Sequence, residues 1–164
     1  MSRTIAIGGF MGVGKSTAGR LLSQRLCLPF VDLDAAIEGH CGLSVRQIFL
    51  EHGEAYFRGV EEKVLKGLLD GPPIVLSLGG GTLHQSGCLE PLQARALIVV
   101  LWMPIEAIQE RIGSDDSTRP LWSESAALFE DREQGYRDAG TLLNVNDLAP
   151  SEVADALERV VACA

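Results

Sequence analysis

The sequence lacks any long apolar run, because no apolar stretch reaches the roughly 18 residues that a membrane-spanning helix needs. It also lacks the features of a signal peptide ahead of its first apolar segment. We therefore expect a chain that has no membrane partner and works in the cytoplasm.

Positive charge is scarce. The formal net charge is −8, and the only lysines are Lys15, Lys63 and Lys66. A surface this acidic excludes nucleic acid and anionic membranes as main partners, since both need an excess of basic side chains. Any anionic ligand must therefore be held by a few cations gathered at one place.

Metal-ligand spacing is absent as well. Four cysteines are scattered without a CxxC pair: Cys27, Cys41, Cys88 and Cys163. Three histidines are far apart and form no HxxxH: His40, His52 and His84. This pattern excludes a zinc site and indicates free thiols in a reducing compartment.

What is present is an alternation of strand-like and helix-like segments over 164 residues, the length of one compact domain. The strand-like runs lie at 3–8, 30–33, 74–78, 96–102 and 141–145. The helical stretches lie at 16–26, 34–40, 44–52, 55–70, 104–111, near 124–138 and after Pro150. Such alternation predicts an α/β fold with a parallel sheet covered on both faces, and a ligand site at the carboxyl ends of its strands.

The stretch "GFMGVGKST" fits the pattern G-x-x-x-x-G-K-[ST] with Gly9, Gly14, Lys15 and Ser16, between a predicted strand and a predicted helix. Glycines let consecutive backbone N–H groups face one anion, and the start of the helix adds its dipole to that attraction. We predict a nucleoside triphosphate site in which Lys15 reaches the phosphates and Ser16 binds Mg²⁺.

Two acids, Asp32 and Asp34, interrupt the second strand-like run. On a strand they would project side by side, so the two charges need a cation or hydrogen-bond donors to compensate them. One acid would hold the water shell of the metal and the other would face an acceptor hydroxyl. The alternative is that Asp34 only caps the following helix.

Further candidates remain ambiguous on local sequence. Arg58 either binds a carboxylate or pairs with Glu61 or Glu62 along a helix. Arg119, in a polar loop, either closes over transferring phosphates or is a solvated surface residue. Arg132 lies on a predicted helix, where a solvated surface residue is the default interpretation. Three glycines directly after a strand, Gly79, Gly80 and Gly81, indicate either a close approach of ligand to backbone or a tight turn.

Six motifs resemble those of the shikimate kinase family, in the same order and over essentially the whole chain. They are "GFMGVGKST", "VDLD", "GEAYFR" with Glu61, "LGGGT", "RPLW" and "REQGY". The resemblance implies a single domain over residues 1–164 with a three-layer α/β/α P-loop kinase fold and a five-stranded parallel sheet. It implies a lid at about 112–123 and a substrate-binding region at about 34–62. It also implies transfer of the γ-phosphoryl group of ATP to the 3-hydroxyl of shikimate.

The same resemblance implies a role for each matching residue. ATP is bound by Gly12, Val13, Gly14, Lys15, Ser16, Thr17, Arg111 and Arg119. Shikimate is bound by Asp34, Arg58, Gly79, Gly80, Gly81 and Arg132. Asp34, Lys15 and Arg119 act in catalysis, and Mg²⁺ is held by Ser16 and, through water, by Asp32. Leu148 stands where members of the family often place an arginine beside adenine.

Three readings remain at this point. A kinase acting on shikimate is favoured, since a nucleotide kinase needs more arginines and a longer lid. Another small-molecule kinase, such as one acting on gluconate, is the nearest alternative within the enzymes. A non-catalytic nucleotide-binding module would have lost at least one of Lys15, Ser16, Asp34 and Arg119. A monomer is expected, because no exposed apolar stripe stands out.

Overall fold

The computed structural model describes residues 3–112 and 125–164, and its centre is a five-stranded, fully parallel sheet. In sequence order the strands are β1 (Thr4–Gly9), β2 (Phe30–Asp32), β3 (Val75–Ser77), β4 (Ala96–Trp102) and β5 (Thr141–Asn144). Their order across the sheet is β2-β3-β1-β4-β5. The predicted parallel sheet of five strands is therefore confirmed.

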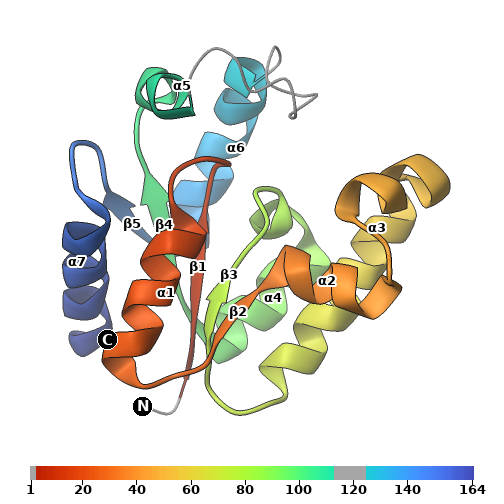
Figure 1. The fold of residues 1–164 in the computed structure, drawn as a ribbon, viewed down its shortest axis with the longest axis horizontal. Coiled ribbons are helices and arrows are strands. Elements are labelled where there is room, and N and C mark those ends of the chain that lie inside the picture. The colour runs from red at the N-terminus through yellow and green to blue at the C-terminus, as the bar shows by residue number, and fades with distance from the viewer. Residues whose placement is uncertain (1–2, 113–124) are drawn as a thin grey trace.

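Helices cover both faces of the sheet and make three layers (Figure 1). One face carries α1 (Lys15–Leu26) and α7 (Pro150–Ala162), which pack against each other. The other face carries α4 (Ser86–Arg95) and α6 (Ser125–Ala139). Because both faces are covered, β1 and β3 are buried along their whole length, as expected of continuous apolar strands.

Two helices, α2 (Leu33–Cys41) and α3 (Val45–Leu69), project beyond β2 as a lobe (Figure 1). The hydroxyl of Ser44 accepts from the N–H of Gln47 at the start of α3, so Ser44 is the N-cap of this helix. Gly53 has φ 78° and interrupts α3, so the two helices predicted on either side of it meet there at a kink.

One prediction about this lobe is wrong. β2 ends at Asp32, and Asp34 lies in the first turn of α2 instead of on the same strand face. It is Asp32, not Asp34, that caps the helix, through an oxygen 3.3 Å from the N–H of Ala35. The strand is only three residues long because the cap turns the chain into the helix at once.

The helix α4 was not predicted, since its ten residues include Pro91 and show little separation of apolar and polar faces. Between β4 and the undescribed segment lies α5 (Ile105–Ile112), which begins one residue after Pro104. Within residues 3–112 and 125–164, no helix has the length and apolar character needed to span a membrane.

Candidate active site

The loop between β1 and α1 has the backbone of a phosphate cradle. Gly12 and Gly14 have φ 81° and φ 99°, values that residues with a side chain rarely adopt. The helix starts directly after Gly14. The ammonium of Lys15 donates to the carbonyl oxygen of Phe10 at 2.9 Å, which holds the lysine across the loop. N–H groups at a helix start beside a lysine make a site for a phosphate chain.

Beside this loop, three oxygen-bearing side chains meet at the carboxyl ends of neighbouring strands. The hydroxyl of Ser16 donates to Asp32 at 2.8 Å and lies 3.2 Å from the hydroxyl of Ser77. Hydroxyl and carboxylate oxygens are the ligands that Mg²⁺ prefers, usually with water and phosphate completing its shell. Ser77 was missed from the sequence, although its place at the end of a strand, just before three glycines, was a signal.

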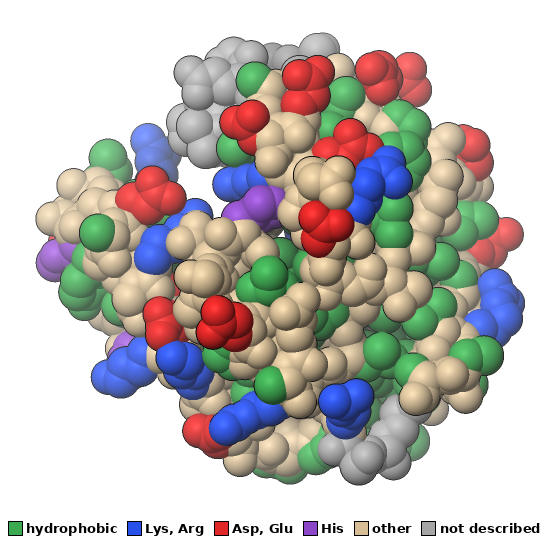
Figure 2. Space-filling model, turned by 180° about the vertical axis from the view of Figure 1, so that it is seen from behind, with side chains coloured by type: hydrophobic (Ala, Val, Ile, Leu, Met, Phe, Trp, Pro, Cys, Tyr) green, Lys and Arg blue, Asp and Glu red, His purple; other side chains and the backbone are tan. Residues whose placement is uncertain are grey.

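A pocket of about 780 Å³ opens next to the cradle, between the α2–α3 lobe and α6. Figure 2 shows it as a hollow with basic side chains along its walls. Its lining includes all six residues that the sequence predicted to bind substrate: Asp34, Arg58, Gly79, Gly80, Gly81 and Arg132. The other lining residues are Met11, Val45, Phe49, Glu54, Phe57, Glu61, Ala127, Leu128 and Asp131.

Arg58 is held in place by acids of its own helix, α3. Its Nη1 donates to Glu61 at 2.7 Å, and its Nη2 donates to Glu54 at 3.2 Å. Glu61 is 1% exposed and also accepts from the hydroxyl of Thr82 at 2.7 Å. The two alternatives for Arg58 are thus not exclusive, since the pairing with Glu61 fixes an arginine that still lines the pocket. Thr82 was not identified from the sequence.

Arg132 reaches the same place from α6, on the opposite wall. A Cβ atom added to Gly81 would lie 2.9 Å from Nη2 of Arg58 and 3.2 Å from Nη2 of Arg132, so both guanidinium groups come together over that glycine. Two guanidinium groups facing one space form a site for a carboxylate or a phosphate.

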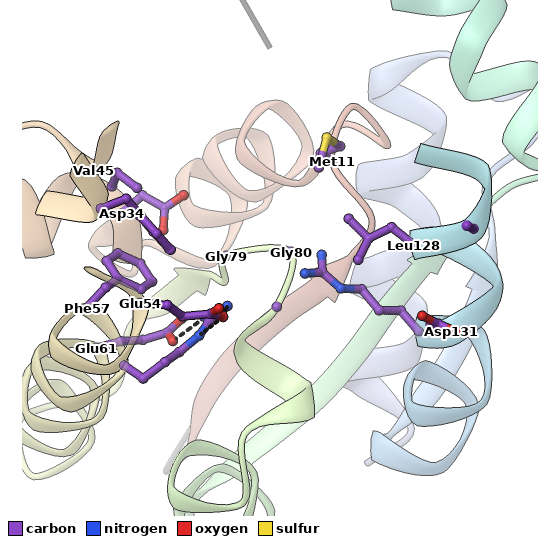
Figure 3. Close-up of a pocket in the computed structure, with 15 residues that line it drawn as sticks. Met11, Asp34, Val45, Glu54, Phe57, Glu61, Gly79, Gly80, Leu128 and Asp131 are labelled. Atoms are coloured by element: carbon purple, nitrogen blue, oxygen red, sulfur yellow. Dashed lines mark hydrogen bonds and ion pairs between the residues drawn. The ribbon is translucent and has the colours of Figure 1, made fainter. Parts of the chain in front are cut away.

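The three glycines are needed for space, not for unusual dihedral angles. None of them is among the described residues with positive φ, and Gly81 has φ −105°. A Cβ on Gly79 would lie 3.0 Å from Oδ1 of Asp34. Figure 3 shows Gly79 and Gly80 between the wall with Asp34 and Glu61 and the wall with Leu128. Of the two readings from the sequence, the geometry therefore supports close approach to the backbone.

Asp34 is the titratable group at the junction of cradle and pocket. Burial raises its pKa to about 6, and the negative charges of Asp32 and Glu61 add to the shift, while Lys15 opposes it. A carboxyl with a raised pKa in a pocket suits a group that takes a proton near neutral pH.

A second cavity, of about 500 Å³, lies beside the loop that follows β5. Arg111 lines it and approaches the carbonyl oxygens of Val13 at 3.4 Å and Leu148 at 3.5 Å. Arg111, predicted to bind ATP, thus lies next to the phosphate cradle. Arg119 and the predicted lid fall outside the described residues, apart from residue 112.

Three features define the class of protein: a glycine cradle with a lysine and a serine at the start of α1, a sheet of order 2-3-1-4-5, and an arginine-lined pocket beside them. Together they are typical of a P-loop kinase that acts on a small molecule. The model of the shikimate kinase family matches residues 11–162, and the chain belongs to this family.

Similar proteins agree with this assignment. A shikimate kinase from Persephonella marina is 35% identical over 157 residues, which cover 93% of this chain and 95% of the relative. The structure of a shikimate kinase from Acinetobacter baumannii in complex with shikimate has a TM-score of 0.92 and 30% identity, covering 99% of this chain and 94% of that one. The structure of the Aquifex aeolicus shikimate kinase has a TM-score of 0.86 and 37% identity, covering 97% of this chain and 96% of that one.

Proposed function

We propose that this enzyme transfers the γ-phosphoryl group of ATP to the 3-hydroxyl of shikimate, with Asp34 beside the acceptor and Arg58 and Arg132 on its carboxylate. The observation that carries the proposal is the meeting of the two guanidinium groups over Gly81, in a pocket that also holds Asp34. A carboxylate fits between two arginines at one end of the pocket, and an acceptor hydroxyl fits beside Asp34 at the end next to the cradle.

Each residue then has one task. Arg58, held by Glu61, and Arg132 orient the acceptor, which removes much of the entropic barrier to an in-line transfer. Asp34 accepts the hydrogen bond of the acceptor hydroxyl. It takes the proton as the new P–O bond forms and the bond between the γ-phosphorus and the bridging oxygen breaks, so that ADP leaves. Lys15 stabilises the charge on the phosphoryl oxygens, and we assign Arg119 the same role.

The proposal includes Mg²⁺, since Ser16, Asp32 and Ser77 present the oxygen set that this ion takes in phosphoryl-transfer sites. A bound Mg²⁺ would neutralise part of the negative charge of the phosphates. Ser16 would hold the ion directly, and Asp32 would hold it through water. We expect the enzyme to act as a monomer.

The proposal is tested by offering Mg-ATP with shikimate, gluconate or a nucleoside monophosphate and measuring ADP release. We expect rapid release with shikimate and, with the other two, no more than the slow hydrolysis seen without an acceptor. Turnover with gluconate or a nucleotide but not with shikimate would make the chain another small-molecule kinase. No turnover with any of them, with ATP still bound, would favour a non-catalytic module.

The pH profile gives a further prediction. Since the pKa of Asp34 is raised to about 6, kcat/KM for shikimate should fall tenfold per pH unit below about pH 6, where the carboxyl is protonated. ¹³C NMR of the aspartate carboxyl groups, compared with the Asp34→Asn variant, should show the same midpoint in the free enzyme. A midpoint near 4 in both measurements would show that burial does not shift this group.

Removal of the Ser77 hydroxyl tests the metal cluster. In Ser77→Ala, Ser16 loses one neighbouring oxygen, so we expect the Mg²⁺ concentration for half-maximal rate to rise about tenfold, in the range for loss of an outer partner of a metal site. The matched control is Ser23→Ala, a buried serine that donates to the carbonyl of Arg20 on α1. An unchanged Mg²⁺ requirement in Ser77→Ala would remove Ser77 from the cluster.

A further inference from the structure

Two side chains that the proposed mechanism does not use join the glycine loop to α6. Tyr136, on α6, is 2% exposed, and its hydroxyl donates to the carbonyl oxygen of Gly80 at 2.6 Å. His84 ends the short 3₁₀ helix η1 (Thr82–His84), and its Nε2 lies 3.0 Å from the carbonyl oxygen of Arg132. The two rings meet edge to face, with centroids 4.9 Å apart at an interplanar angle of 80°.

Both groups are hydrogen-bond donors at neutral pH. Burial raises the pKa of Tyr136 to about 12, so the phenol keeps its proton, although the charge of Arg132 and hydrogen bonding to its side chain oppose the shift. Burial lowers the pKa of His84. The hydrogen bond to the backbone of Arg132 opposes this shift, whereas the charges of Arg132 and Arg58 add to it. A neutral imidazole facing a carbonyl must carry its hydrogen on Nε2.

The histidine is fitted closely against the helix. A Cβ atom on Gly135 would lie 2.6 Å from Nε2 of His84 and 2.8 Å from its Cδ2, so a glycine is needed there for the ring to reach the backbone of α6. The other ring nitrogen, Nδ1, is buried without a hydrogen-bond partner in the described part of the chain. An unpaired buried nitrogen opposes folding, so stability alone does not account for a histidine at this position.

The contacts of His84 and Tyr136 join the glycine loop to α6, the helix that carries Arg132. In the proposed function, Arg132 must bind the same carboxylate as Arg58. Gly80 follows β3, whereas Arg132 comes from a helix that the chain enters through residues 113–124, so no short connection sets their spacing. Nη1 of Arg132 lies 3.3 Å from the place of a Cβ on Gly80. A small slide of α6 along the glycine loop would therefore move Arg132 away from Arg58.

We propose that His84 and Tyr136 are positioning residues, which hold α6 against the glycine loop so that Arg132 and Arg58 face one substrate carboxylate. This inference rests on the proposed function and deepens it, because it names the groups that set the geometry of the carboxylate site. Hydrogen bonds that support a binding side chain fix its position to within a fraction of an ångström.

The test is steady-state kinetics of single variants. Tyr136→Phe keeps the ring and removes only the hydroxyl, and we expect KM for shikimate to rise about tenfold, with KM for ATP unchanged and kcat within about threefold, on the scale of one lost hydrogen bond. His84→Leu should act in the same direction, and His84→Gln should restore most of the loss, because its amide nitrogen donates from a similar position.

The matched controls are Tyr56→Phe and His52→Leu, which alter a tyrosine and a histidine on the exposed part of α3. Both should leave KM for shikimate unchanged. A second readout uses the carboxamide analogue of shikimate, for which the penalties of Tyr136→Phe and His84→Leu should largely disappear, since the analogue lacks the charge that Arg132 binds.

Two results would overturn the inference. One is an unchanged KM for shikimate in both variants. The other is an equal loss with both substrates that follows a lower melting temperature, as a purely structural role predicts. If Arg132→Met raises KM for shikimate while these variants do not, the inference fails and the proposed function stands. If Arg132→Met itself has no effect, the carboxylate site of the proposed function fails.

Discussion

Replacing Asp34 by asparagine should lower kcat by about a thousandfold while ATP binding is retained, within the usual range for loss of a general base. The amide keeps the size of the side chain and can still contact an acceptor hydroxyl, but it takes no proton. ATP affinity should persist because the phosphates are held by the cradle glycines before α1 and by Lys15, the first residue of α1, and none of these is changed. Single-turnover transfer and nucleotide titration separate the two effects, and near-normal turnover would remove Asp34 from its role.

The same variant should be more stable than the parent protein. The pKa of Asp34 rises from 3.8 to about 6 on folding, so the ionised carboxylate disfavours the folded state above pH 6. By linkage this penalty is about 2–3 kcal/mol at pH 8 and fades as the pH falls from 6 towards 3.8. Asp34→Asn should therefore unfold at a higher temperature than the parent at pH 8 and lose this advantage by pH 4.

Replacing Arg132 by methionine should raise KM for shikimate roughly 10- to 100-fold, since hydrogen bonds to charged groups contribute about 1.5–3 kcal/mol each. Methionine preserves most of the apolar stem, so packing of α6 is retained. Initial rates with varied shikimate at saturating ATP measure the effect, and KM for ATP should not change.

The matched control is Arg137→Met on the same helix. Arg137 pairs with Glu133 at the surface, and exposed pairs of this kind contribute little. The carboxamide analogue of shikimate shows whether Arg132 acts on the carboxylate. The parent enzyme should bind the analogue weakly, and Arg132→Met should bind it no worse than the parent does. A full penalty with the analogue would show that Arg132 does not contact the carboxylate.

Features encoded by neighbouring residues were predictable from the sequence. The cradle could be predicted because Gly14, Lys15 and Ser16 are contiguous and stand between a clear strand and a clear helix. The parallel sheet followed from strands too apolar to face water. The boundary between the helices predicted at 44–52 and 55–70 is of the same kind, since the kink lies at Gly53 between them.

Features that depend on distant residues were harder to predict. Arg58 and Arg132 are ambiguous alone, because only the folded chain brings α3 and α6 to opposite walls of one pocket. The place of Asp34 was mistaken because a strand of three residues leaves no periodicity to count, and Asp32 ends it as a cap. From the sequence, Ser77 is an ordinary strand residue, because only the folded chain brings its hydroxyl beside that of Ser16.

The central claim is tested most directly by identifying the product that forms from shikimate and Mg-ATP. After incubation with the enzyme, ³¹P and ¹H NMR should show one new phosphate monoester, on the 3-hydroxyl of shikimate, in an amount equal to the ADP formed. ADP formation without any shikimate ester, or an ester on another hydroxyl, would contradict the account.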